Sequence, residues 1–121
     1  MPSSIAHDSH NLIVAGTNDA DMVLAGNTVR KSKGGLAFVV NGRVIGELAL
    51  PVAGLMSAES VEVVMENVQH LKDALRTHGI AEGIDPFMTL AFVSLPVIPK
   101  LRLNTYGIVD VKKQRIVPAV F

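Results

Sequence analysis

The chain has 121 residues, of which 49% are apolar and 18% charged, with eleven basic residues, eleven acidic residues and no cysteine. This length suffices for one domain with its own core, and the composition excludes a disordered tail, disulfides and thiol catalysis. Zero net charge argues against nucleic-acid binding, and no apolar run approaches the roughly 20 residues that span a bilayer.

The first predicted elements are a short strand and a helix. Leu12 to Ala15 form an apolar run, and a helix is expected to begin at Thr17, Asn18 or Asp19, whose side chains can cap free amide groups. Gly34-Gly35 is expected to end this helix. The expected apolar face consists of Met22, Ala25, Gly26 and Val29.

A β-hairpin is predicted next, with strands at Leu36 to Val40 and Arg43 to Leu50. Asn41-Gly42 joins them, and this pair tolerates the positive φ angles of a type I′ turn. The hairpin is therefore expected to form part of the sheet.

A longer helix follows, because Ser57 can cap it and His78-Gly79 can close it. Glu59 and Glu62 would favour its N-terminal end. Its apolar residues follow helical spacing and predict core packing: Val61, Val64, Met65, Val68, Leu71 and Leu75.

The last third of the chain is harder to assign. Phe87 to Leu95 is almost continuously apolar, which fits either a buried strand or a short buried helix. Hydrophobicity predicts that Phe87, Met88 and Phe92 belong to the core. Pro96 and Pro99 predict an extended stretch. Short closing strands are expected within residues 101–121, with a turn at Tyr106-Gly107.

This order of elements predicts an α+β (or α/β) single domain, in which two helices pack on a mixed β-sheet containing the hairpin.

The opening segment concentrates polar side chains beside the first strand. His7, Asp8 and His10 suggest a metal site, but residues three apart on a regular strand point to opposite faces. We therefore assign no metal to the chain. Two interpretations remain open for His7, Asp8, His10 and Asn11: a functional edge, or residues that satisfy a turn.

Several long strings give the chain a resemblance to a known family. These are AHDSHN and GTND near the start, LPVAGLMS at 50–57, DPFMTLAFVSLPVIPKLRL at 85–103 and YGIVDV at 106–111. In this order and spacing they resemble the C-terminal domain of bacterial-type adenine deaminases, over nearly the whole chain.

The resemblance implies a parent enzyme of the amidohydrolase type. In that family a metal-bearing barrel, with manganese or iron expected, activates water to convert adenine to hypoxanthine and ammonia in purine salvage. The barrel's His-x-His ligand motif does not match anything here, so we expect a domain truncated at its N-terminus and lacking the barrel. The isolated chain is then expected to be inactive and to need no cofactor of its own.

The resemblance also implies partners. His7, Asp8, His10 and Asn11 are candidates for a substrate-proximal or barrel-facing edge, and Gly54, Leu55 and Met56 for interdomain contacts, although these three can equally form a buried elbow. The expected partners are the catalytic barrel and further copies of the chain, in the cytoplasm, with no nucleic acid or membrane. The alternative is a free-standing binding or assembly module of the same fold.

Overall fold

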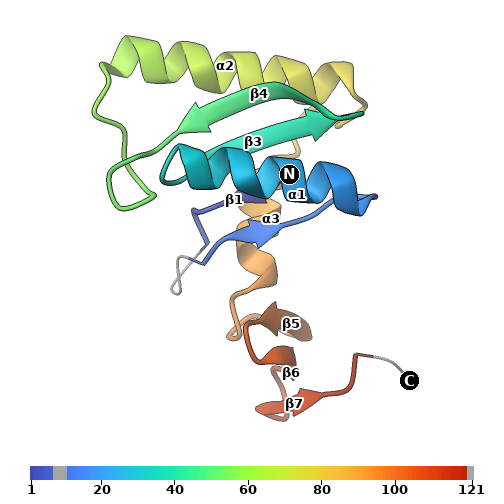
Figure 1. The fold of residues 1–121 in the computed structure, drawn as a ribbon. Coiled ribbons are helices and arrows are strands. Elements are labelled where there is room, and N and C mark those ends of the chain that lie inside the picture. Colours follow the sequence, from blue (N-terminus) through green and yellow to red (C-terminus); the bar gives the residue numbers. More distant parts are fainter. Residues whose placement is uncertain (7–10, 120–121) are drawn as a thin grey trace.

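The computed structural model describes residues 1–6 and 11–119, and in this part of the chain it shows three helices and two antiparallel sheets (Figure 1). The elements are β1 (Pro2–Ser3), β2 (Ile13–Val14), α1 (Asp19–Lys31), β3 (Gly35–Val40), β4 (Arg43–Ala49), α2 (Val61–Thr77), α3 (Pro86–Val93), β5 (Leu101–Asn104), β6 (Gly107–Asp110) and β7 (Arg115–Val117).

The predicted α+β class is confirmed, with two differences of detail. The expected mixed sheet is instead a pair of sheets with only antiparallel pairing among the described strands, in the orders β2-β1-β3-β4 and β5-β6-β7. A third helix, α3, occupies the segment whose type periodicity left open.

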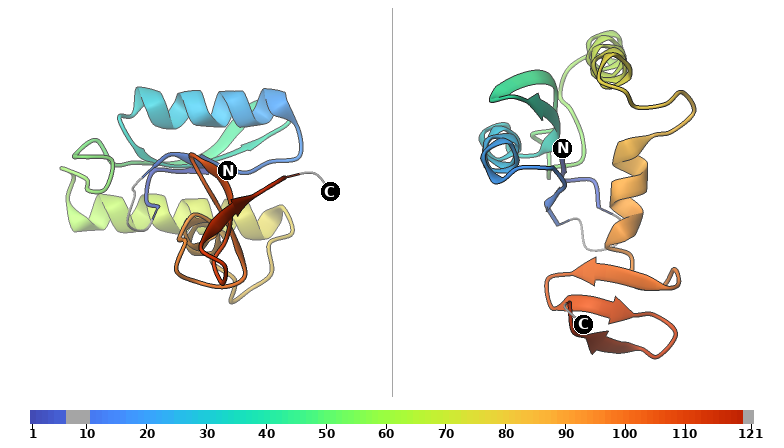
Figure 2. Two further views of the ribbon diagram at one scale, coloured as in Figure 1. Left: turned by 90° about the horizontal axis from the view of Figure 1, so that it is seen from below. Right: turned by 90° about the vertical axis from the view of Figure 1, so that its right-hand side faces the viewer.

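The four-stranded sheet is the middle of three layers. Helix α1 covers one face and α2 covers the other (Figure 2). Strand β3 is therefore buried or half-buried along its whole length, with no polar face. On the α2 side Phe38, Leu48 and Leu50 pack with Leu71, Leu75 and Phe87 as one core.

Helix α1 begins where the sequence predicts. Asn18 is its N-cap, and its side-chain oxygen accepts a hydrogen bond from the Asp21 amide at 2.8 Å. The helix ends before Gly34-Gly35, with Ser32 as C-cap, and the Gly34 amide donates to the Val29 carbonyl at 2.9 Å. Ala25 and Val29 of the predicted apolar face are buried.

The hairpin is also confirmed, and α1 holds its turn. Asn41 and Gly42 have φ angles of 50° and 73°, as a type I′ turn requires. The Asp21 carboxylate accepts hydrogen bonds from the Asn41 amide at 3.0 Å and from the Gly42 amide at 2.7 Å. One side chain thus fixes the hairpin turn to the first helix.

These bonds make the domain's stability depend on pH. The hydrogen bond from Asn18, followed by that from the Gly42 amide, lowers the pKa of the Asp21 carboxyl. A lowered folded-state pKa stabilises the fold above the unfolded-state value, about 3.9, and this contribution is lost as pH falls through the folded-state pKa. We expect Asp21→Asn to flatten the loss of stability below about pH 4, as measured by urea unfolding across that range. Asp19→Asn, which removes a charge from the same helical turn, is the control, and equal profiles for the two variants would contradict the prediction.

Helix α2 departs from its prediction at its start. Its N-cap is Ser60, which accepts from the Val63 amide, whereas Ser57 accepts a local bond from the Glu59 amide. His78 is the C-cap and Gly79 follows, as predicted. Leu71 and Leu75 are buried, but Val61 and Met65 of the predicted core stripe are mostly exposed. The reason is that the buried residues of α2 all lie in the second half of the helix.

Helix α3 corrects two further predictions. Phe87 is buried as predicted, but Met88 and Phe92 are about 40% exposed, because only one side of α3 faces the body. Pro96 lies in a turn instead of an extended stretch, and the Ile98 amide donates to the Leu95 carbonyl at 3.3 Å. Proline's fixed φ suits this turn as well as an extended chain.

Helix α3 leads away from the layered body to β5, β6 and β7, which lie beyond its C-terminal end (Figure 2). We call the segment from Leu101 to Val117 the C-terminal arm. Short strands are confirmed in this segment, but the chain reverses at Thr105-Tyr106, one residue before the predicted turn, because Gly107 already pairs with Asn104 as the first residue of β6.

Candidate functional site

The opening polar motif lies on the connection between two paired strands. Pro2 of β1 is opposite Val14 of β2, and Ser3 is opposite Ile13, so both ends of the connection are fixed side by side. His7, Asp8 and His10 lie outside the described residues. Asn11 is described and exposed. A functional role for these four residues stays a prediction.

A junction next to this motif joins two of the predicted candidate segments. The Ser4 hydroxyl donates to the Gly54 carbonyl at 2.5 Å and accepts from the Gly35 amide at 2.7 Å, and the Ser4 amide donates to the Gly35 carbonyl at 3.0 Å. Ser4 therefore ties the opening segment to the loop that contains Gly54. No periodicity or motif in the sequence singled out Ser4.

Close backbone packing explains the glycines of this junction. A Cβ atom on Gly34 would lie 2.2 Å from the Gly54 Cα, and one on Gly35 would lie 1.9 Å from the Leu48 carbonyl oxygen. No side chain fits at these distances. Gly34-Gly35 was predicted only as a helix end. In the structure Gly34 packs on Gly54 in the loop after β4, and Gly35 packs on Leu48 of β4.

The loop after β4 presents one of the predicted interdomain residues. Val52 and Met56 exchange backbone hydrogen bonds of 3.0 and 3.1 Å around a turn at Ala53-Gly54. Gly54 is buried, Leu55 is half-buried and Met56 is mostly exposed. The elbow interpretation therefore describes Gly54, while Met56 is available to a partner.

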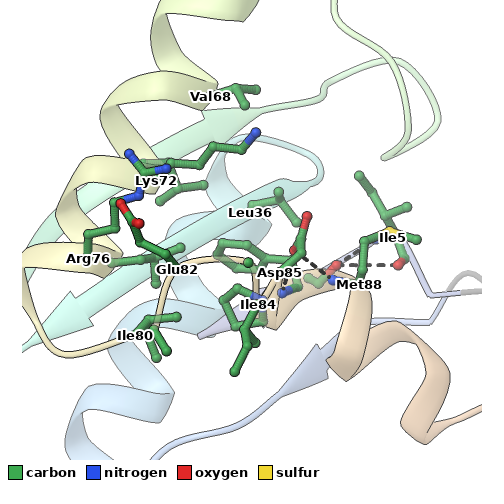
Figure 3. A pocket seen from close by; sticks show the side chains of 17 residues that line it. Ile5, Leu36, Val68, Lys72, Arg76, Ile80, Glu82, Ile84, Asp85 and Met88 are labelled. Carbon is green, nitrogen blue, oxygen red and sulfur yellow. Dashed lines mark hydrogen bonds between the residues drawn. The ribbon is translucent and has the colours of Figure 1, made fainter.

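A pocket of about 390 Å³ opens between α2, the connection after it and α3 (Figure 3). Its apolar lining combines core residues such as Leu71 and Phe87 with the more exposed Ile80, Ile84 and Met88. Its size lies within the range of small-molecule pockets. Sequence reasoning missed this pocket, because its walls come from β1, β3, α2, α3 and the connections beside them.

Charged groups of both signs line the same pocket. Lys72 and Arg76 lie one turn apart on α2, and Glu82 and Asp85 come from the following connection. Asp85 is the N-cap of α3 and accepts from the Phe87 and Met88 amides, each at 3.0 Å. Arg76 pairs with Asp73 at 3.5 Å. The described lining suits an apolar ligand. It lacks a nucleophilic side chain paired with a base.

The two described histidines are part of the scaffold. A ring nitrogen of His78 lies 2.7 Å from the Ala74 carbonyl, and the ring packs edge-on against Phe38 at 5.4 Å. His70 contacts the Ile45 carbonyl at 3.3 Å. Within residues 1–6 and 11–119, no three His, Cys, Asp or Glu side chains group as metal ligands would. None of the helices in this part combines the length and hydropathy that a bilayer crossing requires.

These features define a small α+β domain with a ligand-sized pocket, and its described residues contain no group of potential metal ligands. The model of the family described as "Adenine deaminase C-terminal domain" matches residues 1–115. The chain therefore belongs to the adenine deaminase C-terminal domain family.

Relatives from several bacteria agree with this assignment. The chain is 49% identical to "Adenine deaminase 2" of Carboxydothermus hydrogenoformans over 98% of its own length and 21% of the relative's. It is 51% identical to "Adenine deaminase" of Kosmotoga olearia over 92% of its length and 19% of the relative's. It is 44% identical to "Adenine deaminase" of Desulforamulus reducens over 99% of its length and 20% of the relative's. The chain thus spans about a fifth of the length of these relatives.

Proposed function

We propose that the chain serves as the C-terminal domain of an adenine deaminase, beside a catalytic barrel that hydrolyses adenine to hypoxanthine and ammonia. In this reaction water adds to the amino-bearing carbon of adenine and the amino group leaves as ammonia. The observation that carries the proposal is the family match over residues 1–115, which leaves little of the chain outside the family domain.

A divalent metal, manganese or iron, belongs to the proposed activity, and the described residues of this chain do not fit it. Catalytic metal sites take about three protein ligands and keep one open position. The described residues offer no such group. We propose that the metal belongs to the barrel, and we assign the described residues of this chain no step of the hydrolysis.

The role left to this chain is to support the barrel. Ser4 and its bonds to Gly35 and Gly54 hold the start of the opening segment on the sheet. The barrel-facing role of His7, Asp8, His10 and Asn11 is part of this proposal.

We expect the purified chain to show no adenine turnover and no stoichiometric manganese, iron or zinc. The physical reason is the absent ligand set among its described residues. Ammonia release and elemental analysis of the chain alone check this, with the same assays on the chain supplied with a barrel domain as the positive control. Turnover by the chain alone that a chelator abolishes and metal restores would refute the proposal.

One observation favours the alternative of a free-standing binding module, namely the ligand-sized pocket beside α2. Titration calorimetry of the chain with adenine and hypoxanthine separates the two functions. Tight purine binding by the chain alone, abolished by a bulky substitution at Ile84 in the pocket wall, would favour the module.

A further inference from the structure

The C-terminal arm has one face built from aliphatic side chains. In its antiparallel register Leu103 is opposite Ile108, and Ile108 is opposite Val117, so these three side chains form a row across all three strands. Leu101 lies two residues from Leu103 on the same face. We call Leu101, Leu103, Ile108 and Val117 the apolar arm face.

The opposite face of β5 is polar. Arg102 and Asn104, which are half-buried, alternate with the two exposed leucines. A strand with one covered face normally has its apolar side covered and its polar side in solvent. Arg102 donates to the carbonyls of Leu101 and Pro99 at 2.6 and 2.9 Å, and the Asn104 side chain accepts from the Tyr106 amide at 2.8 Å. The sequence of β5 thus marks the leucine side as the one to be covered.

The described chain leaves that side open. Leu101 is 46% exposed and Leu103 is 52% exposed. Among the described elements, β5, β6 and β7 make their substantial contacts only with one another, and α1 and α2 are both used on the other sheet. The arm therefore lies beyond the layered body without a covering layer (Figure 1). Sheets of this size gain their stability by packing an apolar face on another layer.

We propose that the apolar arm face docks on the catalytic portion of adenine deaminase, meaning the four-fifths of the relatives' length that this chain does not match. The inference rests on the proposed function and names the surface through which the domain meets its partner. The expected counterpart is an apolar patch. Asp110 and Arg115 lie beside Leu101 on the same face, so charged groups bound the patch at one end.

The size of the patch favours this occupant over a second copy of the chain. Four partly exposed aliphatic side chains offer at most a few hundred Å², whereas separate molecules that associate stably bury about 800 Å² each. A domain tethered to its partner needs much less area, because the tether supplies an effective concentration of roughly millimolar. The expected association with further copies of the chain is therefore an alternative outcome of the test.

The experiment uses a chimera in which this chain replaces the matched segment of the Carboxydothermus hydrogenoformans protein, with which it shares 49% identity. Amide hydrogen exchange of β5 and β6 is compared between the chimera and the 121-residue chain. Leu103→Lys places a charge on the apolar arm face. Ile116→Lys is the matched control, since Ile116 is 58% exposed on the opposite face of the other edge strand.

We expect exchange in β5 and β6 to be at least about tenfold slower in the chimera than in the free chain. Leu103→Lys should abolish this protection, and Ile116→Lys should retain it. Both variants should melt like the wild type as free chains, because surface substitutions change stability little. If Leu103→Lys does not fold, Leu101→Lys tests the same face.

Equal exchange in the chimera and the free chain would overturn the docking proposal. Concentration-dependent protection in the free chain, lost in Leu103→Lys, would also overturn it by assigning the face to a second copy. Adenine turnover by the chimera is read separately. A protected arm in an inactive chimera would support docking while counting against the proposed function.

Discussion

Among substitutions that add a single methyl group to this domain, Gly35→Ala is expected to cause the largest loss of stability. The new Cβ would lie 1.9 Å from the Leu48 carbonyl oxygen and 3.1 Å from the Leu50 amide nitrogen. Both are backbone atoms of the neighbouring strand and its continuation, so the hairpin itself would have to separate. The φ angle of Gly35, 130°, is also one that alanine adopts only with strain.

We expect a loss of more than about 4 kcal/mol in the free energy of unfolding, which is a large part of the 5 to 15 kcal/mol of a typical domain. Urea denaturation followed by circular dichroism measures it. Gly42→Ala is the matched control, because Gly42 has a φ of 73° but no atom within 4 Å of the added Cβ. It should cost only about 1 kcal/mol. Equal losses in the two variants would show that backbone strain, and not the contact with β4, decides the effect.

The contrast between these glycines shows which structural features local sequence patterns can predict. Asn41-Gly42 is a local signal, because a two-residue turn is specified by the residues in it, and the hairpin was predicted correctly. Gly34-Gly35 is constrained by Leu48 and Gly54, which are distant in sequence. A helix-end interpretation was all that local reasoning could give it.

The same limit applies to the last third of the chain. Helix α3 has apolar residues on all sides, so its spacing could not separate helix from strand, and its exposed Met88 could not be distinguished from its buried Phe87. Short closing strands were predicted within residues 101–121 from their apolar residues. Their position beyond the body depends on α3, and the sequence carried no signal for it.

The candidate site divides in a similar way. The opening motif and Gly54 were found because they stand in long, unusual strings, and the structure brings their neighbourhoods together through Ser4. The pocket beside α2 was missed, since Leu36, Leu71 and Phe87 meet only after three elements have packed. Proximity in the fold is a tertiary property, and the local patterns of a single sequence do not report it.

Leu75→Ala should lower the free energy of unfolding by about 3 kcal/mol, as expected when a buried leucine is truncated and the site collapses only partly. Leu75 is 3% exposed and belongs to the core with Phe38 and Leu71. Met65 is the matched control, because it belongs to the same predicted stripe of α2 but is 65% exposed. Met65→Ala should change stability by no more than about 0.5 kcal/mol. Urea unfolding of both variants decides whether the core consists of the residues buried in the structure or of the whole apolar stripe predicted from the sequence. A loss of stability in Met65→Ala as large as that in Leu75→Ala would favour the predicted stripe.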